Sequence, residues 1–131
     1  MLYGEGEHID VEGTFLERNP TLTPSAHALE VFQQGCFICQ PTVFFKRTTR
    51  LLVGSLDVTL KTAFDFEYWL RVFKRFPGRI GFVDALQARS RLHDACIART
   101  QRRRVALENM QIVQRHLGDP QPHWLTSYAK E

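Results

Sequence analysis

Two acidic residues, Asp65 and Glu67, open the most strongly patterned stretch of the chain and are the first candidates for chemistry. A carboxylate within hydrogen-bond reach of a hydroxyl can act as a general base. The predicted start of a helix is also where a carboxylate bonds exposed backbone amides. Glu67 follows two positions later, where a helix turns its side chain away from Asp65, so we interpret it as secondary. The residues alone leave catalysis and capping open for Asp65.

A second pair that could take part in chemistry, Arg91 and His93, lies at the end of a segment, residues 86–93, that is predicted to be extended. Side chains alternate along a strand, so both point to one face if residues 90–93 are extended. Arginine suits phosphate oxygens, and histidine can ligate a divalent metal or donate to a leaving group. A lone histidine is also an ordinary satisfied polar residue, and that interpretation stays open.

Residues 36–45 are almost continuously apolar and predict a strand buried on both faces of a mixed sheet. Pro41 interrupts the stretch and cannot donate to a sheet ladder, so this point must lie at an edge, a bulge or an opening that a ligand can reach. Gln40 beside it needs hydrogen-bond partners, from the backbone or from a ligand.

Three cysteines raise the question of a redox or zinc site, because Cys36 and Cys39 form a CxxC. No second CxxC and no paired histidines follow at zinc-finger spacing. We therefore predict that both are buried structural thiols, and we interpret Cys96 in the same way.

The elements that position these residues are predicted to be a mixture of helices and strands. Helices are expected from a cap at residues 23–25 to Phe32, over 48–53, over 64–76 and over 100–117. Strands are expected at residues 2–3, followed by an exposed hairpin or loop with Gly4, Gly6, Asp10 and Gly13 as turn residues. Further strands are expected at 80–84 and 86–93, as two strands or one bent strand. The last residues form a tail that docks through Trp124 and Tyr128.

Length and composition fit one water-soluble globular domain, with 131 residues, 44% hydrophobic and 24% charged. No apolar run approaches the ~20 residues that cross a bilayer, and the first residues do not resemble a signal peptide, so a cytoplasmic location is expected. The net charge of +3 is mild, and no nucleic-acid-binding motif is present, so no nucleic-acid partner is expected.

Five segments, taken together, carry a family resemblance. They are residues 2–6 with 9–10, 38–47 (ICQPTVFFKR), 53–57 (VGSLD), 63–71 (AFDFEYWLR) and 88–93 (ARSRLH). In this order and spacing they resemble the C-terminal, acceptor-side portion of bacterial family-2 glycosyltransferases of the GT-A type, which build cell-surface polysaccharides from sugar nucleotides. The resemblance covers about residues 2–118, with 119–131 as a C-terminal tail. It implies a partial GT-A-like α/β fold, a mixed sheet flanked by helices, lacking the N-terminal nucleotide-binding half.

The resemblance also implies roles for individual residues. Asp65 corresponds to the general base that deprotonates the acceptor hydroxyl in an inverting displacement. Acceptor-binding positions are Gln40, Pro41, Trp69 and Glu67. Trp69 can offer an apolar platform to a sugar ring, although an aromatic residue at helical spacing also suits the core. Arg91 and His93 correspond to an Arg-x-His near the donor diphosphate, with His93 also a possible metal ligand.

The partners follow from the same resemblance: a nucleotide-sugar donor, a saccharide or lipid-linked acceptor, and Mg or Mn in the parent enzyme. The chain contains no Asp-x-Asp, the family's metal motif, so we expect it to bind no metal and to be inactive alone. The alternative is a non-catalytic interaction domain derived from a glycosyltransferase, with self-association through an open sheet edge. The arginines at 99, 102, 103 and 104 suit either a solvated face or an anionic membrane surface at the inner side of the membrane.

Overall fold

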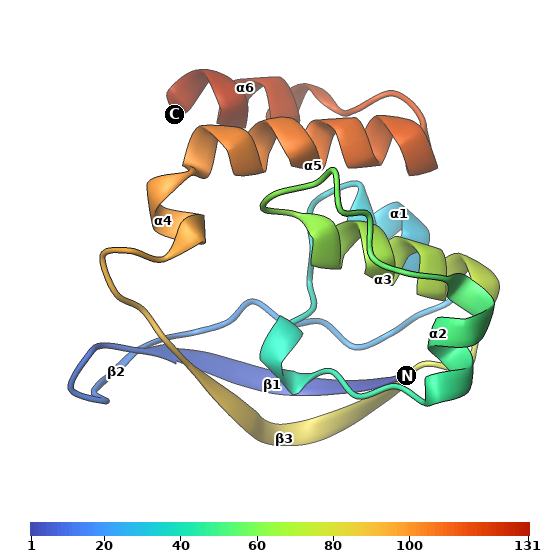
Figure 1. The fold of residues 1–131 in the computed structure, drawn as a ribbon, viewed down its shortest axis with the longest axis horizontal. Coiled ribbons are helices and arrows are strands. Elements are labelled where there is room, and N and C mark those ends of the chain that lie inside the picture. Colours follow the sequence, from blue (N-terminus) through green and yellow to red (C-terminus); the bar gives the residue numbers. More distant parts are fainter.

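The computed structural model describes residues 1–131 and has an α/β fold, so the predicted class is confirmed. Its strands are β1 (Leu2–Ile9), β2 (Phe15–Arg18) and β3 (Gly81–Arg91). Its helices are α1 (Ala28–Phe32), α2 (Arg47–Val53), α3 (Phe64–Arg75), α4 (Ile97–Thr100), α5 (Arg102–Leu117) and α6 (Pro122–Lys130), with a 3-10 turn, η1 (Gln40–Thr42). The sheet lies at one side, α1 and α3 lie over it, and α5 and α6 form the outermost layer (Figure 1).

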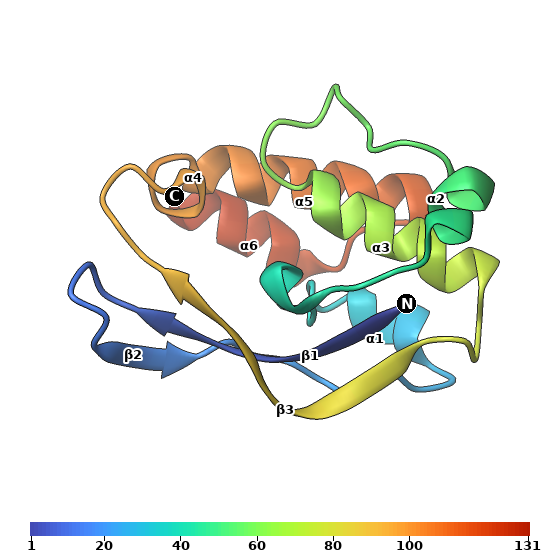
Figure 2. The same ribbon diagram turned by 60° about the horizontal axis from the view of Figure 1, so that its bottom comes forward.

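The three-stranded sheet has the order β2-β1-β3. β1 pairs with β2 antiparallel and with β3 parallel, so the sheet is mixed as predicted. The pairing with β3 shifts register on both sides of Glu5, and β3 bends at its middle (Figure 2). Residues 81–91 therefore form one bent strand, which was one of the two predicted alternatives, and His93 lies beyond its end.

β1 is longer than the sequence predicts, because Gly4 and Gly6 lie inside the strand and not in a loop. A Cβ on Gly4 would lie 2.8 Å from the carbonyl oxygen of Val83, and a Cβ on Gly6 would overlap Sγ of Cys39. Both glycines allow a neighbouring segment to approach the backbone closely, which is a known reason for a glycine inside a strand. The turn interpretation was therefore wrong for these two positions.

The predicted buried strand over residues 36–45 is also wrong. Pro41 is the second residue of η1, and only Phe44 pairs with the sheet, through two backbone hydrogen bonds with Leu2. The hydroxyl of Thr42 lies 3.1 Å from both the N–H and the carbonyl oxygen of Gly4, where a ladder would otherwise continue. A proline without an N–H and a hydroxyl that bonds β1 therefore fold this apolar stretch across the sheet instead of along it.

The three cysteines are all free, and only Cys39 is fully buried as predicted. Cys39 is buried against β1, and its burial raises the pKa of the thiol. Cys96 is half-buried and Cys36 is exposed, so the prediction was wrong for Cys36.

The helices follow the predicted pattern, with two differences. α1 starts at Ala28 and not at residues 23–25, because a turn in which the Ala28 N–H bonds the Ser25 carbonyl comes first. The C-terminal tail is a helix, α6, whose Trp124 is buried and donates its indole N–H to the carbonyl of Gln33 at 2.8 Å. None of the helices combines the length and the hydrophobicity needed to cross a bilayer.

α3 forms the centre of the core. Its buried side chains cover most of its circumference, and Phe73 packs edge-on against Phe32 of α1 at 5.0 Å between ring centroids. Phe32 in turn stacks on Phe37 at 4.3 Å. α5 packs on α3 through Ile112 and Val113, which are fully buried. The core therefore holds α3, and with it Asp65, in a fixed position relative to β1 and η1.

Candidate functional site

A pocket of about 270 Å³ opens beside the N-terminal end of α3. Its walls come from η1, from α2 with the segments on either side of it, and from α3. They consist of Gln40, Phe45, Arg50, Gly54, Leu56, Phe64, Asp65, Tyr68 and Trp69. We call it the Asp65 pocket. It brings Gln40 together with Asp65 and Trp69, which lie one turn apart on α3, so three predicted site residues from two distant segments meet here.

A larger hollow of about 440 Å³ lies between α1, the end of α3 and the start of β3. Its lining includes Leu29, Phe73 and Ile80, and none of its side chains titrates. An apolar hollow without a convergent polar group offers no chemistry, so the smaller Asp65 pocket is the candidate site.

Asp65 is the only carboxylate in the lining of the Asp65 pocket. It is half-buried, takes part in no ion pair, and accepts one backbone hydrogen bond, from the N–H of Phe66 at 2.8 Å. Burial raises its pKa, and the backbone hydrogen bond opposes this shift only in part. A carboxylate with a raised pKa is a stronger base than an ordinary aspartate.

The amides ahead of α3 are bonded by a different carboxylate, Glu108 of α5. Its two oxygens accept hydrogen bonds from the backbone N–H groups of Lys61, Thr62 and Ala63 at 2.9, 2.8 and 3.0 Å, and from the Thr62 hydroxyl at 2.7 Å. Burial alone would raise the pKa of Glu108, but these hydrogen bonds outweigh it and the pKa is lowered. Glu108 therefore fixes the segment that leads into α3, whereas Asp65 bonds a different amide, that of Phe66 inside the first turn.

Aromatic side chains form one wall of the Asp65 pocket. The rings of Phe45 and Tyr68 lie 5.8 Å apart, and Trp69 lies 5.8 Å from Tyr68 and 6.3 Å from Phe45. Trp69 is 5% exposed, and its Nε1 is buried without a hydrogen-bond partner in the protein. The two interpretations of Trp69 therefore combine, because the side chain belongs to the core and also closes the pocket.

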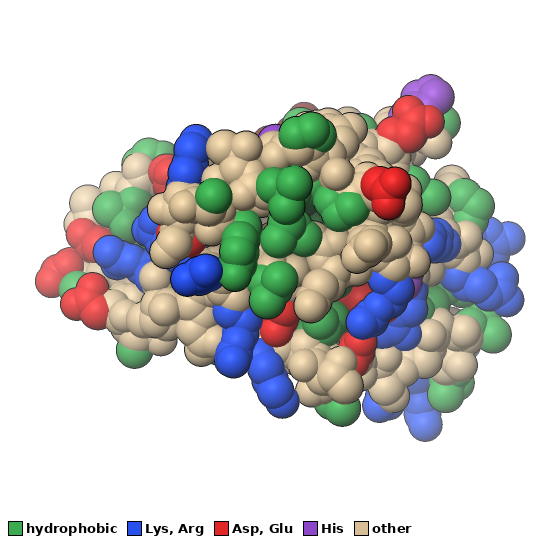
Figure 3. Space-filling view, turned by 90° about the horizontal axis from the view of Figure 1, so that it is seen from above, with side chains coloured by type: hydrophobic (Ala, Val, Ile, Leu, Met, Phe, Trp, Pro, Cys, Tyr) green, Lys and Arg blue, Asp and Glu red, His purple; other side chains and the backbone are tan.

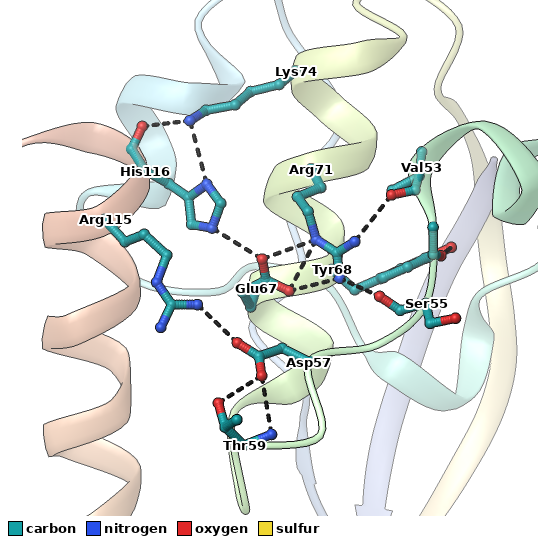
Figure 4. Close-up of polar contacts among 11 residues, drawn as sticks. Val53, Ser55, Asp57, Thr59, Glu67, Tyr68, Arg71, Lys74, Arg115 and His116 are labelled. Atoms are coloured by element: carbon teal, nitrogen blue, oxygen red, sulfur yellow. Dashed lines mark hydrogen bonds and ion pairs between the residues drawn. The ribbon is translucent and has the colours of Figure 1, made fainter.

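Glu67 lies in a separate network and does not line the Asp65 pocket (Figure 4). It is 3% exposed, and its oxygens accept hydrogen bonds from Nε and Nη2 of Arg71 at 2.9 to 3.0 Å. Its Oε1 also lies 3.0 Å from Nε2 of His116 on α5. Arg71 donates as well to the carbonyls of Val53 and Ser55. This arrangement joins α3 to α5 and to the end of α2, so Glu67 serves the fold and not the predicted acceptor site.

The same network fixes the state of His116. Nζ of Lys74 lies 3.4 Å from Nδ1 of His116 and donates to its backbone carbonyl at 2.6 Å (Figure 4). A neutral imidazole that carries its proton on Nε2 can donate to Glu67 and accept from the ammonium group. Burial and the charge of Lys74 lower the pKa of His116, whereas Glu67 opposes the shift.

Arg91 and His93 do not reach the Asp65 pocket. The guanidinium of Arg91 donates to the backbone carbonyls of Asp10 and Val11 at 3.0 and 2.6 Å and so holds the turn after β1. His93 is exposed just beyond β3, and its own N–H points to Sγ of Cys96. Of the predicted site residues, those around Gln40 and Asp65 thus meet in one pocket, and Arg91 and His93 lie elsewhere. Pro41 is exposed and lies outside the lining, next to Gln40.

No group of three or more His, Cys, Asp or Glu side chains in the chain is arranged to hold a metal ion. His93 has no such neighbours, so the residues present do not fit a divalent metal site.

The arginines at the start of α5 surround an open hollow of about 520 Å³, together with Thr100, Gln101 and Glu131. Arg103 stacks on the ring of Tyr128 at 4.9 Å, Arg99 lies 3.7 Å from Asp94, and Arg102 has no ion pair. Hydrophobic side chains gather over the middle of the face formed by α5 and α6, with Lys and Arg on either side (Figure 3).

No protein-family model, characterised protein or solved structure matches this chain. The geometry of the Asp65 pocket and the five segments that resemble the glycosyltransferases are therefore the grounds for assigning a function.

Sequence reasoning missed Glu108, Arg50 and the aromatic residues Phe45 and Tyr68. A signal for Glu108 exists, because it is the only acidic residue in α5 and its position falls on the buried helical face four residues before Ile112. Arg50 and Phe45 carry no local signal, because only the fold of residues 36–54 brings them to α3.

Proposed function

We propose that this chain is the acceptor-side portion of a family-2 glycosyltransferase of the GT-A type, in which Asp65 is the general base. The observation that carries the proposal is the half-buried carboxylate of Asp65, which has no ion pair and lines a small aromatic-walled pocket. Its hydrogen bond comes from the neighbouring N–H of Phe66, so a bound hydroxyl can still reach the carboxylate.

The chemistry proposed for the pocket is proton removal from an acceptor hydroxyl. Asp65 takes the proton while the hydroxyl oxygen forms a bond to the anomeric carbon of the donor. The bond from that carbon to the diphosphate oxygen breaks, and the diphosphate leaves with the electron pair. Burial raises the pKa of Asp65, which favours the proton transfer. The apolar faces of a sugar ring suit the wall made by Trp69, Tyr68 and Phe45.

Saccharide binding tests the acceptor role without requiring a donor site. We expect methyl glycosides added to ¹⁵N-labelled protein to shift the amide signals of residues around Gln40 and Asp65. Phe45→Ala removes part of the aromatic wall and is expected to weaken binding about ten-fold. Phe44→Ala is the matched control, because Phe44 is 69% exposed and does not line the pocket. Equal effects of the two variants, or shifts confined to other surfaces, would count against the proposal.

Activity provides a second test. The chain has no Asp-x-Asp, so we expect the purified chain to transfer no sugar. When the same segment is joined to a donor-binding half, Asp65→Asn is expected to lower kcat by about 10²- to 10⁴-fold with little change in acceptor KM. Transfer by the chain alone, abolished by Asp65→Asn, would contradict the expected inactivity.

A non-catalytic interaction domain is the second candidate function. It is favoured by β3, an 11-residue edge strand on which Val83 and Leu86 are exposed. Unpaired edges of this length invite strand addition. This candidate predicts concentration-dependent association that Val83→Lys prevents, in the absence of any saccharide binding.

The arginine hollow at the start of α5 is proposed to contact an anionic membrane surface. Three arginines in a row, with Leu107 and Leu125 exposed on α5 and α6, suit a negatively charged bilayer. We expect sedimentation with vesicles that contain phosphatidylserine but not with phosphatidylcholine alone, and each Arg→Glu change at 102, 103 or 104 to remove about 1 kcal/mol. Arg79→Glu on a distant loop is the control, and binding that ignores lipid charge would exclude the contact.

A further inference from the structure

Arg50 brings a positive charge to the Asp65 pocket that no group of the protein neutralises. It extends from the middle of α2 and is one of the lining residues. Its guanidinium takes part in no ion pair and donates no hydrogen bond, including to Asp65 across the pocket. Arg50 shares this lining with Tyr68, whose hydroxyl donates to the carbonyl of Gly54, another residue of the pocket wall.

Two other arginines near α3 form ion pairs within the protein. Arg71 is held by Glu67 and by two backbone carbonyls, and Arg115 pairs with Asp57 at 2.8 Å. The pKa of Asp65 is raised by burial, with no contribution from Arg50. Arg50 is thus neither part of the folding network nor a partner that stabilises the charged form of Asp65.

We propose that the Asp65 pocket takes a pyranoside that carries a negatively charged substituent, a carboxylate or a phosphate monoester, which Arg50 binds. This inference rests on the proposed function for the identity of the ligand as a saccharide acceptor. A guanidinium matches both anions with two parallel hydrogen bonds. The ring lies against Trp69, Tyr68 and Phe45, and a free hydroxyl faces Asp65. The volume of about 270 Å³ is slightly below the ~300 Å³ at which pockets for drug-sized ligands begin, so it suits one ring.

The arrangement separates two charges by function. Asp65 has to remain without a cationic partner, because a bound guanidinium would lower its pKa and weaken it as a base. An anionic substituent on the ligand occupies Arg50 and keeps it away from Asp65. Arg50 therefore determines which acceptor binds, whereas Asp65 carries out the proton transfer.

The test compares methyl glucoside with methyl glucuronide, which differ only at C6. We expect calorimetry to give about ten-fold tighter binding of the glucuronide, with a preference that falls as salt is added. Arg50→Gln should reduce the glucuronide to the affinity of the glucoside, and Arg50→Lys should retain part of the preference. Arg47→Gln is the matched control, because Arg47 is exposed on the same helix and lies outside the pocket.

The outcomes distinguish the inference from the proposed function. Equal affinity for the two glycosides, or a preference that survives Arg50→Gln, overturns the inference and leaves saccharide binding intact. Failure of both glycosides to bind overturns the acceptor role itself.

Inorganic phosphate and glucose 6-phosphate are added as further probes. Phosphate alone binding as tightly as the sugar phosphate would reduce Arg50 to a simple anion site and also overturn the inference. Because Arg50 is exposed, its variants should have the same melting temperature as the wild type. A change in affinity can then be assigned to the lost guanidinium and not to unfolding.

Discussion

Asp65 and Glu67 are two carboxylates separated by one residue in the first turn of the same helix, and they have opposite surroundings. Glu67 is 3% exposed and is bonded by Arg71 and His116. Asp65 has one hydrogen bond from its own helix, no ion pair, and a place in the wall of a pocket. The helix determines that the two point in different directions. What each then does depends on the elements that pack on either side.

The comparison shows how a carboxylate becomes available for chemistry. Glu67 faces α5, where His116 and Lys74 extend the network to a neighbouring helix. Asp65 shares a pocket with residues of η1 and α2, none of which forms an ion pair with it. The carboxylate that lines this pocket is therefore available to a ligand, whereas the carboxylate that faces α5 is occupied by the fold.

The largest loss of stability, measured as the free energy of unfolding, is expected for Glu67→Gln. This substitution leaves the partly buried guanidinium of Arg71 without a counter-charge. Removing one partner of a buried ion pair typically costs about 3 kcal/mol. Urea unfolding at pH 7 measures this loss, and Glu17→Gln on the exposed strand β2 is the control, with a change within about 0.5 kcal/mol. A loss below about 1 kcal/mol for Glu67→Gln would mean that the two carboxylates of α3 are equally dispensable.

A smaller loss, about 2 kcal/mol, is expected for Glu108→Gln, because the amide group offers one acceptor oxygen where the carboxylate offers two. The folded pKa of Glu108 is lowered, so its contribution is present above its ordinary pKa of 4.5 and is lost as the pH falls through the folded value. The wild-type and variant unfolding curves should therefore converge in acid. If Asp65 takes over the freed amides in the variant, ¹³C NMR will show its pKa falling, which would sharpen the comparison.

A pH-dependent effect, smaller than either of these, is expected at His116. Its folded pKa is lowered from 6.5, so the unfolded chain binds more protons in the window below pH 6.5. Stability therefore falls as the pH drops from 6.5 toward the folded pKa. In His116→Gln, whose side-chain amide can still donate to Glu67, unfolding between pH 5 and 7 should lose much of this slope. A slope that is unchanged would assign the pH dependence to groups other than His116.

The smallest change in stability is expected for Asp65→Asn. Burial raises the folded pKa of Asp65, so its charged form is unfavourable at pH 7 and a neutral amide should leave stability within about 0.5 kcal/mol or increase it slightly. As the pH falls through the folded pKa, the wild type should gain stability relative to the variant. A loss above about 1 kcal/mol at pH 7 would show that Asp65 is a structural cap and would end its contrast with Glu67.

Periodicity in the sequence predicted the long elements well. α3 and α5 were predicted because apolar residues recur at helical spacing and glycine follows each helix, at Gly78 and Gly118, both with positive φ. The apolar stretch at 36–45 misled, because a buried strand and a buried irregular segment have the same composition. Pro41 was the warning, and the hydroxyl of Thr42 decided the outcome by bonding Gly4 of β1.

The sequence by itself determined that Asp65 opens a helix, that Glu67 faces elsewhere, and that a proline interrupts the segment beside Gln40. Only the tertiary structure decided that Gln40 and Arg50 reach Asp65 while Arg91 and His93 do not, and that Glu108 holds the amides. The reason is that local periodicity shows only which side of an element is buried. Hydrogen-bond partners far apart in the sequence, such as Thr62 and Glu108 at a separation of 46 residues, depend on how the chain folds back on itself.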